Sequence, residues 1–284
     1  MSRAELLRSL AACLEPPSPA LGPVVAALEL PRTPTAAEHT DLFVFQLHPF
    51  ASVHLGPEGQ LGGVARDRVA GFLRALDVTP PSEPDHLAVL LGAYAQLIDL
   101  DDGAGSRARL ARLALLHEHL WSWLPGFLRR ARELGAAPYL AWADLLQRAL
   151  DAELAELGAP TVLSAHLREA PPLPDPRDGD VPAFLAGLLA PVRSGLVLAR
   201  ADLARAAREL ELGLRIGERA YMLRALLGQD PGATLRFVAA EARRQQAGMR
   251  GDDLVTTFWR DRAGATATLL TELALAGDDL PDTG

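Results

Sequence analysis

The sequence has 284 residues, a formal net charge of −8 and a single cysteine, Cys13. One cysteine excludes a disulfide framework and a cysteine-based zinc site within the chain. The acidic balance argues against non-specific nucleic-acid binding, which needs clustered basic residues to neutralise phosphates. Aromatic residues make up only 5% of the chain, and Leu and Ala dominate its apolar residues. Because Leu and Ala favour helices, composition predicts an all-α protein.

The first part of the chain predicts short helices followed by a long loop. Apolar residues at helical spacing predict helices over 3–14 and 21–30, each of which ends at proline. Thr35 is expected to cap a third helix, because Glu38 three residues later completes a capping box. Residues 48–63 hold two Pro and several Gly and Ser, so they predict a loop of the length that is often functional.

The next part predicts one strongly apolar helix and three further helices around it. A helix is expected over 64–76, and a buried central helix over 84–100 follows a Pro-Pro break. Ser82 is expected to cap the central helix. Ser106 predicts the start of a helix that runs toward Trp123. Two more helices are predicted at 127–134 and 139–157.

Residues 169–181 are rich in Pro and Asp, which predicts a linker. This linker would separate an N-terminal helical domain, 1–168, from a C-terminal helical region, 182–276. Residues 277–284 are expected to form a flexible tail. The C-terminal helices are predicted at 184–189, 199–212, 217–227, 231–246 and 253–276, with a break at 191–195. The sequence therefore predicts a single-chain bundle of about ten helices with a linker before its C-terminal helices.

Two histidine arrangements suggest chemistry, but their spacing argues against it. Asp85 and His86 are neighbours, and adjacent residues on a helix do not face each other. His117 and His119 are two residues apart, whereas metal sites on a helix use a spacing of four. No G-x-S-x-G nucleophile motif is present. We therefore expect no enzyme activity, catalytic residue, metal or cofactor, and a hydrolase that uses His86 is the less favoured alternative.

The location of the protein is predicted from two absences in the sequence. The first fifteen residues lack the apolar stretch of a secretory signal, and no apolar run reaches the length of a membrane-spanning helix. We therefore expect a cytoplasmic protein without stable membrane insertion.

Four segments in fixed order resemble a known family. They are Asp41–Phe45, Pro49 with Ser52–Leu55, Glu83–Leu87, and His119–Phe127, and together they cover about residues 38–150. The sequence Glu-Pro-Asp-His-Leu of the third segment is the most specific of them. With these segments the chain resembles the TorD/DmsD family of redox-enzyme maturation chaperones, which is related to the nitrate reductase delta-subunit chaperones. It departs from the family pattern at His54, where an aromatic residue is common, and in its longer C-terminal part.

The resemblance implies an all-helical, TorD-like fold and a chaperone function. Such a chaperone binds the twin-arginine signal peptide, the apo form, or both, of a molybdopterin-containing oxidoreductase. It acts in the cytoplasm during cofactor insertion and before export. The implied partner is the catalytic subunit with its leader, and no nucleic acid. A structural assembly subunit of a redox enzyme complex is the alternative, and both a monomer and a domain-swapped dimer are compatible with the linker.

A leader peptide with two Arg and an apolar segment requires carboxylates beside an apolar surface. Glu83 and Asp85 are expected to supply the charge, although Asp85 has a second, structural interpretation at the helix N-terminus. Trp123 belongs to a set of aromatic residues that form either an apolar groove or core. The candidate peptide-binding residues are Phe43, Ser52, Leu55, Glu83, Pro84, Asp85, His86, Leu87, His119 and Trp123.

Overall fold

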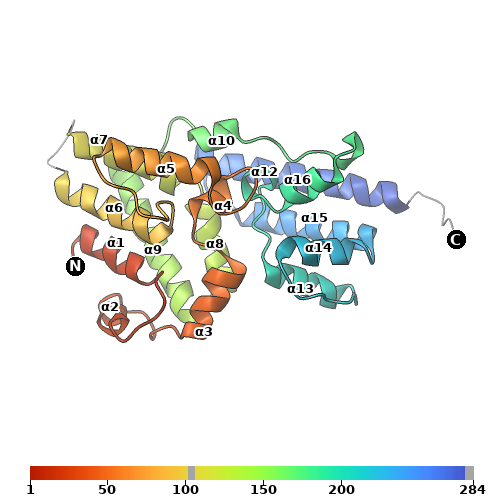
Figure 1. Cartoon of the computed structure of the whole chain (residues 1–284), viewed down its shortest axis with the longest axis horizontal. Helices are drawn as coiled ribbons and strands as arrows, with labels where there is room; N and C mark the ends of the chain where they lie inside the picture. The colour runs from red at the N-terminus through yellow and green to blue at the C-terminus, as the bar shows by residue number, and fades with distance from the viewer. Residues whose placement is uncertain (102–105, 279–284) are drawn as a thin grey trace. The chain divides into compact units, whose positions relative to one another are not determined.

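The computed structural model describes residues 1–101 and 106–278. This part of the chain consists of helices and their connections and contains no β-strand (Figure 1), which confirms the all-α prediction. It holds sixteen α-helices, more than the ten or so expected. Four of them are single turns too short to give a periodic pattern in the sequence: α3 (Ala36–His39), α4 (Ala51–Leu55), α10 (Ala165–Glu169) and α12 (Pro191–Ser194).

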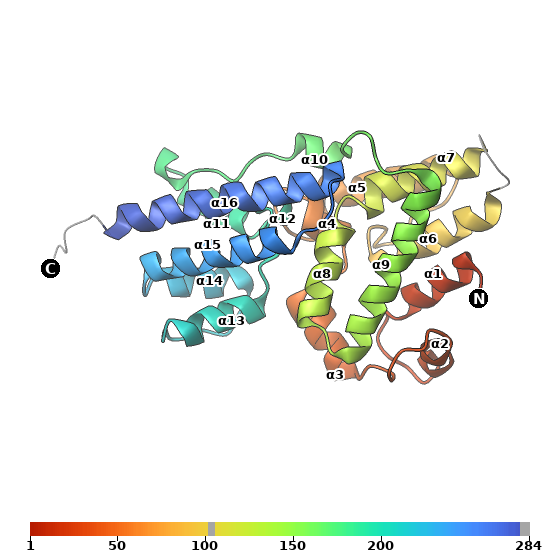
Figure 2. The same ribbon diagram turned by 180° about the vertical axis from the view of Figure 1, so that it is seen from behind.

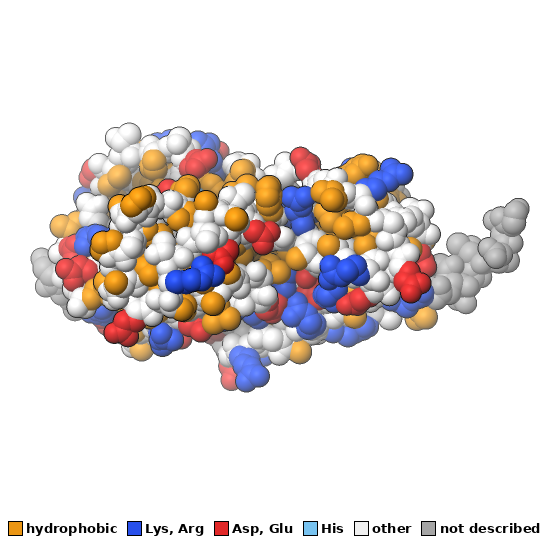
Figure 3. All heavy atoms as spheres, turned by 90° about the horizontal axis from the view of Figure 1, so that it is seen from below, with side chains coloured by type: hydrophobic (Ala, Val, Ile, Leu, Met, Phe, Trp, Pro, Cys, Tyr) orange, Lys and Arg blue, Asp and Glu red, His pale blue; other side chains and the backbone are white. Residues whose placement is uncertain are grey.

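The chain forms two compact units. Unit 1 comprises Met1–Gly56 and Gln60–Glu169, and unit 2 comprises Pro57–Gly59 and Ala170–Gly284. Each unit is described by itself below. None of the helices in the described ranges is both long and apolar enough to cross a membrane. On the face that Figure 3 shows, acidic and basic side chains are interspersed, with hydrophobic groups between them.

Unit 1 is built around the central apolar helix α6 (Leu87–Leu100). Its Leu90, Leu91 and Tyr94 side chains are fully buried, and it packs against α1 and α7. The pair α8 and α9 lies side by side (Figure 2). The other elements of the unit are α1 (Arg3–Ala12), α2 (Leu21–Ala27), η1 (Thr40–Gln46), α5 (Gly63–Ala75), α7 (Arg107–Ala114), η2 (Leu115–Leu120), α8 (Leu124–Leu134) and α9 (Ala137–Leu157).

Two of the three predicted caps in unit 1 are confirmed. Thr35 accepts a hydrogen bond from the Glu38 amide and forms a capping box with that residue. Ser106 accepts one from the Arg109 amide at the start of α7. The prediction that Ser82 caps α6 is wrong, because the helix begins at Leu87 and its N-cap is His86. The helix starts late because the backbone of residues 85–87 pairs with that of residues 49–52.

The predicted loop 48–63 and two predicted helices differ from expectation. The loop contains the short helix α4, because Ala51, Val53 and Leu55 of this helix are buried in the core. Both η1 and η2 are π-helices that continue an α-helix, α3 and α7 respectively. Short π-helical stretches are frequent at functional sites. Each carries residues of a segment on which the family resemblance depends.

Unit 2 has its own core between its helices, with Leu188, Leu203, Leu226 and Leu270 fully buried. The longest helices, α15 and α16, lie side by side (Figures 1 and 2). The elements besides α12 are η3 (Pro176–Asp178), α11 (Val181–Leu188), α13 (Arg200–Glu209), α14 (Arg219–Leu227), α15 (Pro231–Gly248) and α16 (Leu254–Asp278).

Two predictions in unit 2 differ from the structure at their ends. The predicted break at 191–195 contains α12, because Pro191 suits the first position of a helix and Gly195, with φ of 70°, ends it. The predicted tail 277–284 begins inside α16, which extends to Asp278, and residues 279–284 lie outside the described part.

Residues 170–175 within the predicted linker have no regular secondary structure. The Arg262 guanidinium of α16 donates hydrogen bonds to the carbonyl oxygens of Ala170 and Pro171, both at 2.7 Å. Arg193 of α12 donates to the Pro172 carbonyl at 3.3 Å. The segment is therefore fastened to unit 2 through its backbone carbonyl groups.

Candidate peptide-binding site

The start of α6 pairs with the segment before α4. The Ala51 amide donates a hydrogen bond of 3.0 Å to the Asp85 carbonyl, and the Leu87 amide donates one of 2.8 Å to the Pro49 carbonyl. These two bonds flank an antiparallel bridge between Phe50 and His86. We call this pairing, residues 49–52 with 85–87, the junction. It joins the Pro-Ser loop motif to the Glu-Pro-Asp-His-Leu motif, two of the four segments on which the resemblance depends.

The carboxylate of Asp85 holds the junction from inside. Its side chain is only 1% exposed, and one carboxylate oxygen accepts a hydrogen bond of 2.9 Å from the Ser52 amide. The Ser52 hydroxyl in turn accepts a hydrogen bond of 3.2 Å from the Gly62 amide. Of the two interpretations of Asp85, this geometry fits the structural one, because the carboxylate is occupied by backbone and closed to solvent.

His86 presents its ring beside Phe50 at the half-buried edge of the junction. The two ring centroids are 4.7 Å apart in an edge-to-face arrangement. The Nδ1 atom of His86 accepts a hydrogen bond of 3.3 Å from the Ala88 amide, so the neutral ring carries its proton on Nε2. No nucleophile or carboxylate is hydrogen-bonded to this ring in the described part of the chain. The ring therefore acts as a helix cap rather than as half of a catalytic pair.

Two exposed carboxylates lie within electrostatic reach of His86. Burial lowers the pKa of His86, while the negative charges of Glu15 and Glu83 act in the opposite direction. Both glutamates are exposed, and neither forms a hydrogen bond or ion pair through its carboxylate within the described residues. Glu83 belongs to the predicted set. Sequence reasoning missed Glu15, because it follows α1 and nothing in its local pattern connects it with residues near 86.

Eight of the ten predicted site residues are buried, and the two that reach the surface are Glu83 and His86. Phe43 lies in η1 and packs edge-to-face on Tyr139, with ring centroids 4.9 Å apart. Leu55 and Leu87 are at most 3% exposed. The remaining buried members are Ser52, Pro84, Asp85, His119 and Trp123.

The aromatic set around Trp123, which also comprises Trp121, Phe127 and Trp142, forms core rather than an open groove, since all four residues are buried. The Trp123 ring stacks on His54, with centroids 4.8 Å apart and planes 16° from parallel. His54 thus occupies a position where a flat ring is needed, which explains how it replaces the aromatic residue common in the family. The Trp123 indole donates a hydrogen bond of 2.8 Å to the His119 carbonyl.

His119 packs against a second histidine, His166. Its ring lies 5.2 Å from that of Phe72 and 6.2 Å from that of His166, between centroids. Burial, with smaller contributions from His166 and Arg68, lowers the pKa of His119 to about 4. Burial followed by the charge of Arg68 lowers the pKa of His166 to about 4 as well. Both rings are therefore neutral at pH 7.

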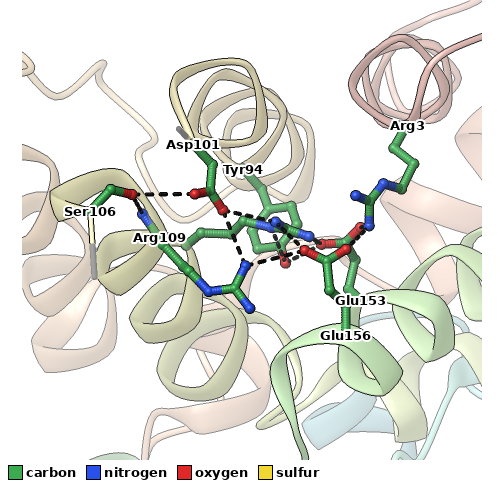
Figure 4. Close-up of polar contacts among 8 residues, drawn as sticks. Arg3, Tyr94, Asp101, Ser106, Arg109, Glu153 and Glu156 are labelled. Atoms are coloured by element: carbon green, nitrogen blue, oxygen red, sulfur yellow. Dashed lines mark hydrogen bonds and ion pairs between the residues drawn. The ribbon is translucent and has the colours of Figure 1, made fainter. Parts of the chain in front are cut away.

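Sequence reasoning also missed a buried ionic network around Arg112, whose side chain is 2% exposed (Figure 4). Its guanidinium donates to Glu153, to Asp101 at 3.1 Å and to Glu156 at 3.0 Å. The Tyr94 hydroxyl donates to Glu153 at 2.7 Å. Hydrogen bonds from Arg112, and then from Arg3, lower the pKa of Glu156 to about 2. The network is structural, since it joins α1, α6, α7 and α9.

The described His, Cys, Asp and Glu side chains were compared with the grouping that a metal site needs. No group of three His, Cys, Asp or Glu side chains among the described residues is positioned to hold a metal ion. Cys13 is buried, and burial raises the pKa of its thiol to about 12.

Comparison with known proteins places the junction inside a family region. Residues 4–129 match the family described as nitrate reductase delta subunit. The chain is also 33% identical over 111 residues to the chaperone protein TorD of Vibrio vulnificus (strain YJ016), over 34% of this chain and 52% of that relative. The chain thus spans about half the length of this curated relative. Residues 4–129 are thus similar to the nitrate reductase delta subunit family, and part of the chain is similar to a TorD chaperone.

Proposed function

We propose that the protein is a cytoplasmic chaperone for a molybdopterin-containing oxidoreductase. It binds the twin-arginine signal peptide of the catalytic subunit, its apo form, or both, during cofactor insertion and before export. The match of residues 4–129 to the nitrate reductase delta subunit family and the similarity to the chaperone protein TorD support the chaperone function. The observation that carries the proposal is that Glu15 and Glu83, whose carboxylates have no partner among the described residues, lie within electrostatic reach of the half-buried ring pair of Phe50 and His86 at the junction.

The surface of the junction matches the chemistry of an Arg-Arg pair. A guanidinium group forms strong, geometrically specific hydrogen bonds with carboxylates, which Glu15 and Glu83 offer. Its flat face also stacks on aromatic rings such as those of Phe50 and His86. Because both glutamates are exposed and lack partners in the described part of the chain, a bound leader would not have to displace an existing ion pair.

The buried members of the predicted set act on this surface indirectly. Ser52, Asp85 and Leu87 fix the backbone on which Phe50 and His86 lie. A binding surface needs such support, because a ring pair that moves loses its alignment with the ligand. In this proposal the Glu-Pro-Asp-His-Leu motif supplies one charged contact, Glu83, one ring, His86, and the scaffold for both.

Removing the two charges tests the role of the junction. In the double variant Glu15→Gln and Glu83→Gln, affinity for a leader peptide with consecutive arginines should fall about tenfold, because two charge-assisted contacts are weakened. Isothermal titration calorimetry measures the change.

The matched control is Glu211→Gln in unit 2, which removes another exposed carboxylate without a partner in the described ranges. It should leave leader affinity unchanged. Equal affinity of the double variant and the wild type would remove these two glutamates from the binding site.

A further inference from the structure

Unit 2 contains an open apolar groove formed by α11, α14, α15 and α16. Its volume is about 380 Å³, within the range of ligand pockets in proteins. Half-buried and exposed aliphatic side chains dominate its lining: Val181, Leu185, Leu227, Leu235 and Leu273, with Phe184 at the base. Val181, at the first position of α11, remains 50% exposed.

Among the described residues, Arg224 is the one charged residue that lines this groove. It is exposed in the last turn of α14 and forms no hydrogen bond or ion pair through its guanidinium within the described residues. A second arginine near the groove, Arg177, is already neutralised by Asp175 at 2.6 Å and Glu272 at 3.2 Å. The groove therefore has one uncompensated positive charge.

The surface beside the groove continues its apolar character along α14. Tyr221 precedes Arg224 by three residues, which places both on the same face of the helix, and its side chain is 47% exposed. Exposed apolar surface next to a concave site is typical of protein interaction sites. The combination of aliphatic walls and a single free guanidinium defines the chemistry of an occupant: apolar side chains next to a carboxylate.

We propose that this groove binds an acidic amphipathic segment of the client polypeptide, with its apolar side chains in the groove and a carboxylate on Arg224. The assignment to a client rests on the proposed chaperone function. A twin-arginine leader does not suit the groove, because Arg224 repels its arginines. Nucleic acid and anionic lipid surfaces are disfavoured because they carry many phosphates, and binding them needs clustered basic residues rather than the single uncompensated guanidinium of Arg224. The groove is thus a second client contact, chemically opposite to the junction.

Fluorescence anisotropy of the full chain with a labelled helical peptide tests this inference. The probe carries Leu at positions i, i+3, i+4 and i+7 with Glu beside them, and two matched probes carry Lys for Glu or Ser for Leu. The wild type should bind the Leu/Glu peptide at least about tenfold more tightly than either matched probe.

Variants connect this binding with the groove. Arg224→Glu should weaken binding of the Leu/Glu peptide about tenfold and favour the Lys probe, because the sign of the free charge is reversed. Val181→Gln should weaken binding by removing apolar contact area. Arg208→Glu is the control, since Arg208 is also exposed in the last turn of its helix, α13, and has no side-chain partner in the described part of the chain. It should bind as the wild type does.

Several results would overturn the inference. They are absence of Leu/Glu peptide binding, equal binding of all three probes, and an affinity that Arg224→Glu does not change. Self-association that Val181→Gln abolishes, or vesicle binding that Arg224→Glu abolishes, without peptide binding, would assign the groove to a second copy or to a membrane instead. A leader peptide titrated in parallel separates the two proposals. If the leader binds and the acidic peptide does not, only the groove inference fails, whereas binding of the acidic peptide without binding of the leader contradicts only the leader site proposed at the junction.

Discussion

At the residue scale, the carboxylate of Asp85 connects two segments that lie 33 residues apart in the sequence, through the Ser52 amide. A buried charge is tolerated only when hydrogen bonds replace its lost hydration, and here a backbone amide provides one. This dependence makes Asp85 a residue that stabilises the fold, because its carboxylate is closed to solvent.

Replacing Asp85 by Ala should lower the free energy of unfolding by about 2 kcal/mol, because the buried Ser52 amide loses its acceptor. Urea unfolding followed by circular dichroism measures the change. The neighbouring Glu83→Ala variant should stay within about 0.5 kcal/mol of the wild type, since that side chain is exposed. An unchanged unfolding midpoint for Asp85→Ala would contradict the structural role.

The buried histidines predict a second effect at this scale. Burial lowers the pKa of His119 from its usual 6.5 to about 4, next to His166 and Arg68. The unfolded chain therefore binds a proton that the folded chain does not, and stability is lost as the pH falls from about 6.5 to about 4. In His119→Phe this loss should be smaller. Urea midpoints at a series of pH values test the prediction, and identical profiles for the two proteins would refute it.

At the scale of elements, the Arg112 network holds four helices of unit 1 together through groups that are costly to bury singly. The variant Glu153→Leu leaves the guanidinium without its closest partner and should cost about 3–5 kcal/mol. The double variant Arg112→Met with Glu153→Leu should recover a large part of that loss, because both buried charges are gone. Thermal and urea unfolding of the set give these values, and a double variant less stable than the single one would disprove the explanation.

The same scale shows what the sequence can and cannot predict. The caps at Thr35 and Ser106 were predictable because each is a hydrogen bond within three residues. The start of α6 was not predictable from local sequence. Residues 85–87 pair with the backbone of residues 49–52, which are distant in the sequence, and the helix therefore begins only at Leu87. The π-helical turns of η1 and η2 share the apolar pattern of ordinary helices, so periodicity does not distinguish them.

In the candidate site, too, local sequence predicts some features and distant residues determine the others. Glu83 and His86 were identifiable from a local motif, whereas Glu15 is brought near His86 by the fold alone. The burial of Phe43 and Trp123 depends on partners from distant helices or loops, Tyr139 and His54. A motif therefore located the junction, but only the structure separates the residues that reach its surface from those that support it.

At the scale of the whole molecule, the two units offer surfaces of opposite chemistry. Unit 1 has two carboxylates near His86 of the junction, unit 2 has a guanidinium at an apolar groove, and none of these groups has a partner in the part of the chain that the structure describes. The net charge of −8 adds a long-range attraction for a basic leader. Because added salt screens exposed charges, leader affinity should fall several-fold as ionic strength rises from about 0.01 M to about 0.15 M. Calorimetry at two salt concentrations measures the change in leader affinity. An affinity that does not depend on salt would contradict electrostatic attraction between the chain and the leader.

The most direct test of the central claim is a calorimetric titration of the wild-type chain with a twin-arginine leader peptide. A second peptide with two glutamines in place of the two arginines is titrated in the same buffer. We expect saturable binding of the arginine peptide and an affinity at least about tenfold weaker for the glutamine peptide. No heat of binding with either peptide, or equal affinity for both, would contradict it.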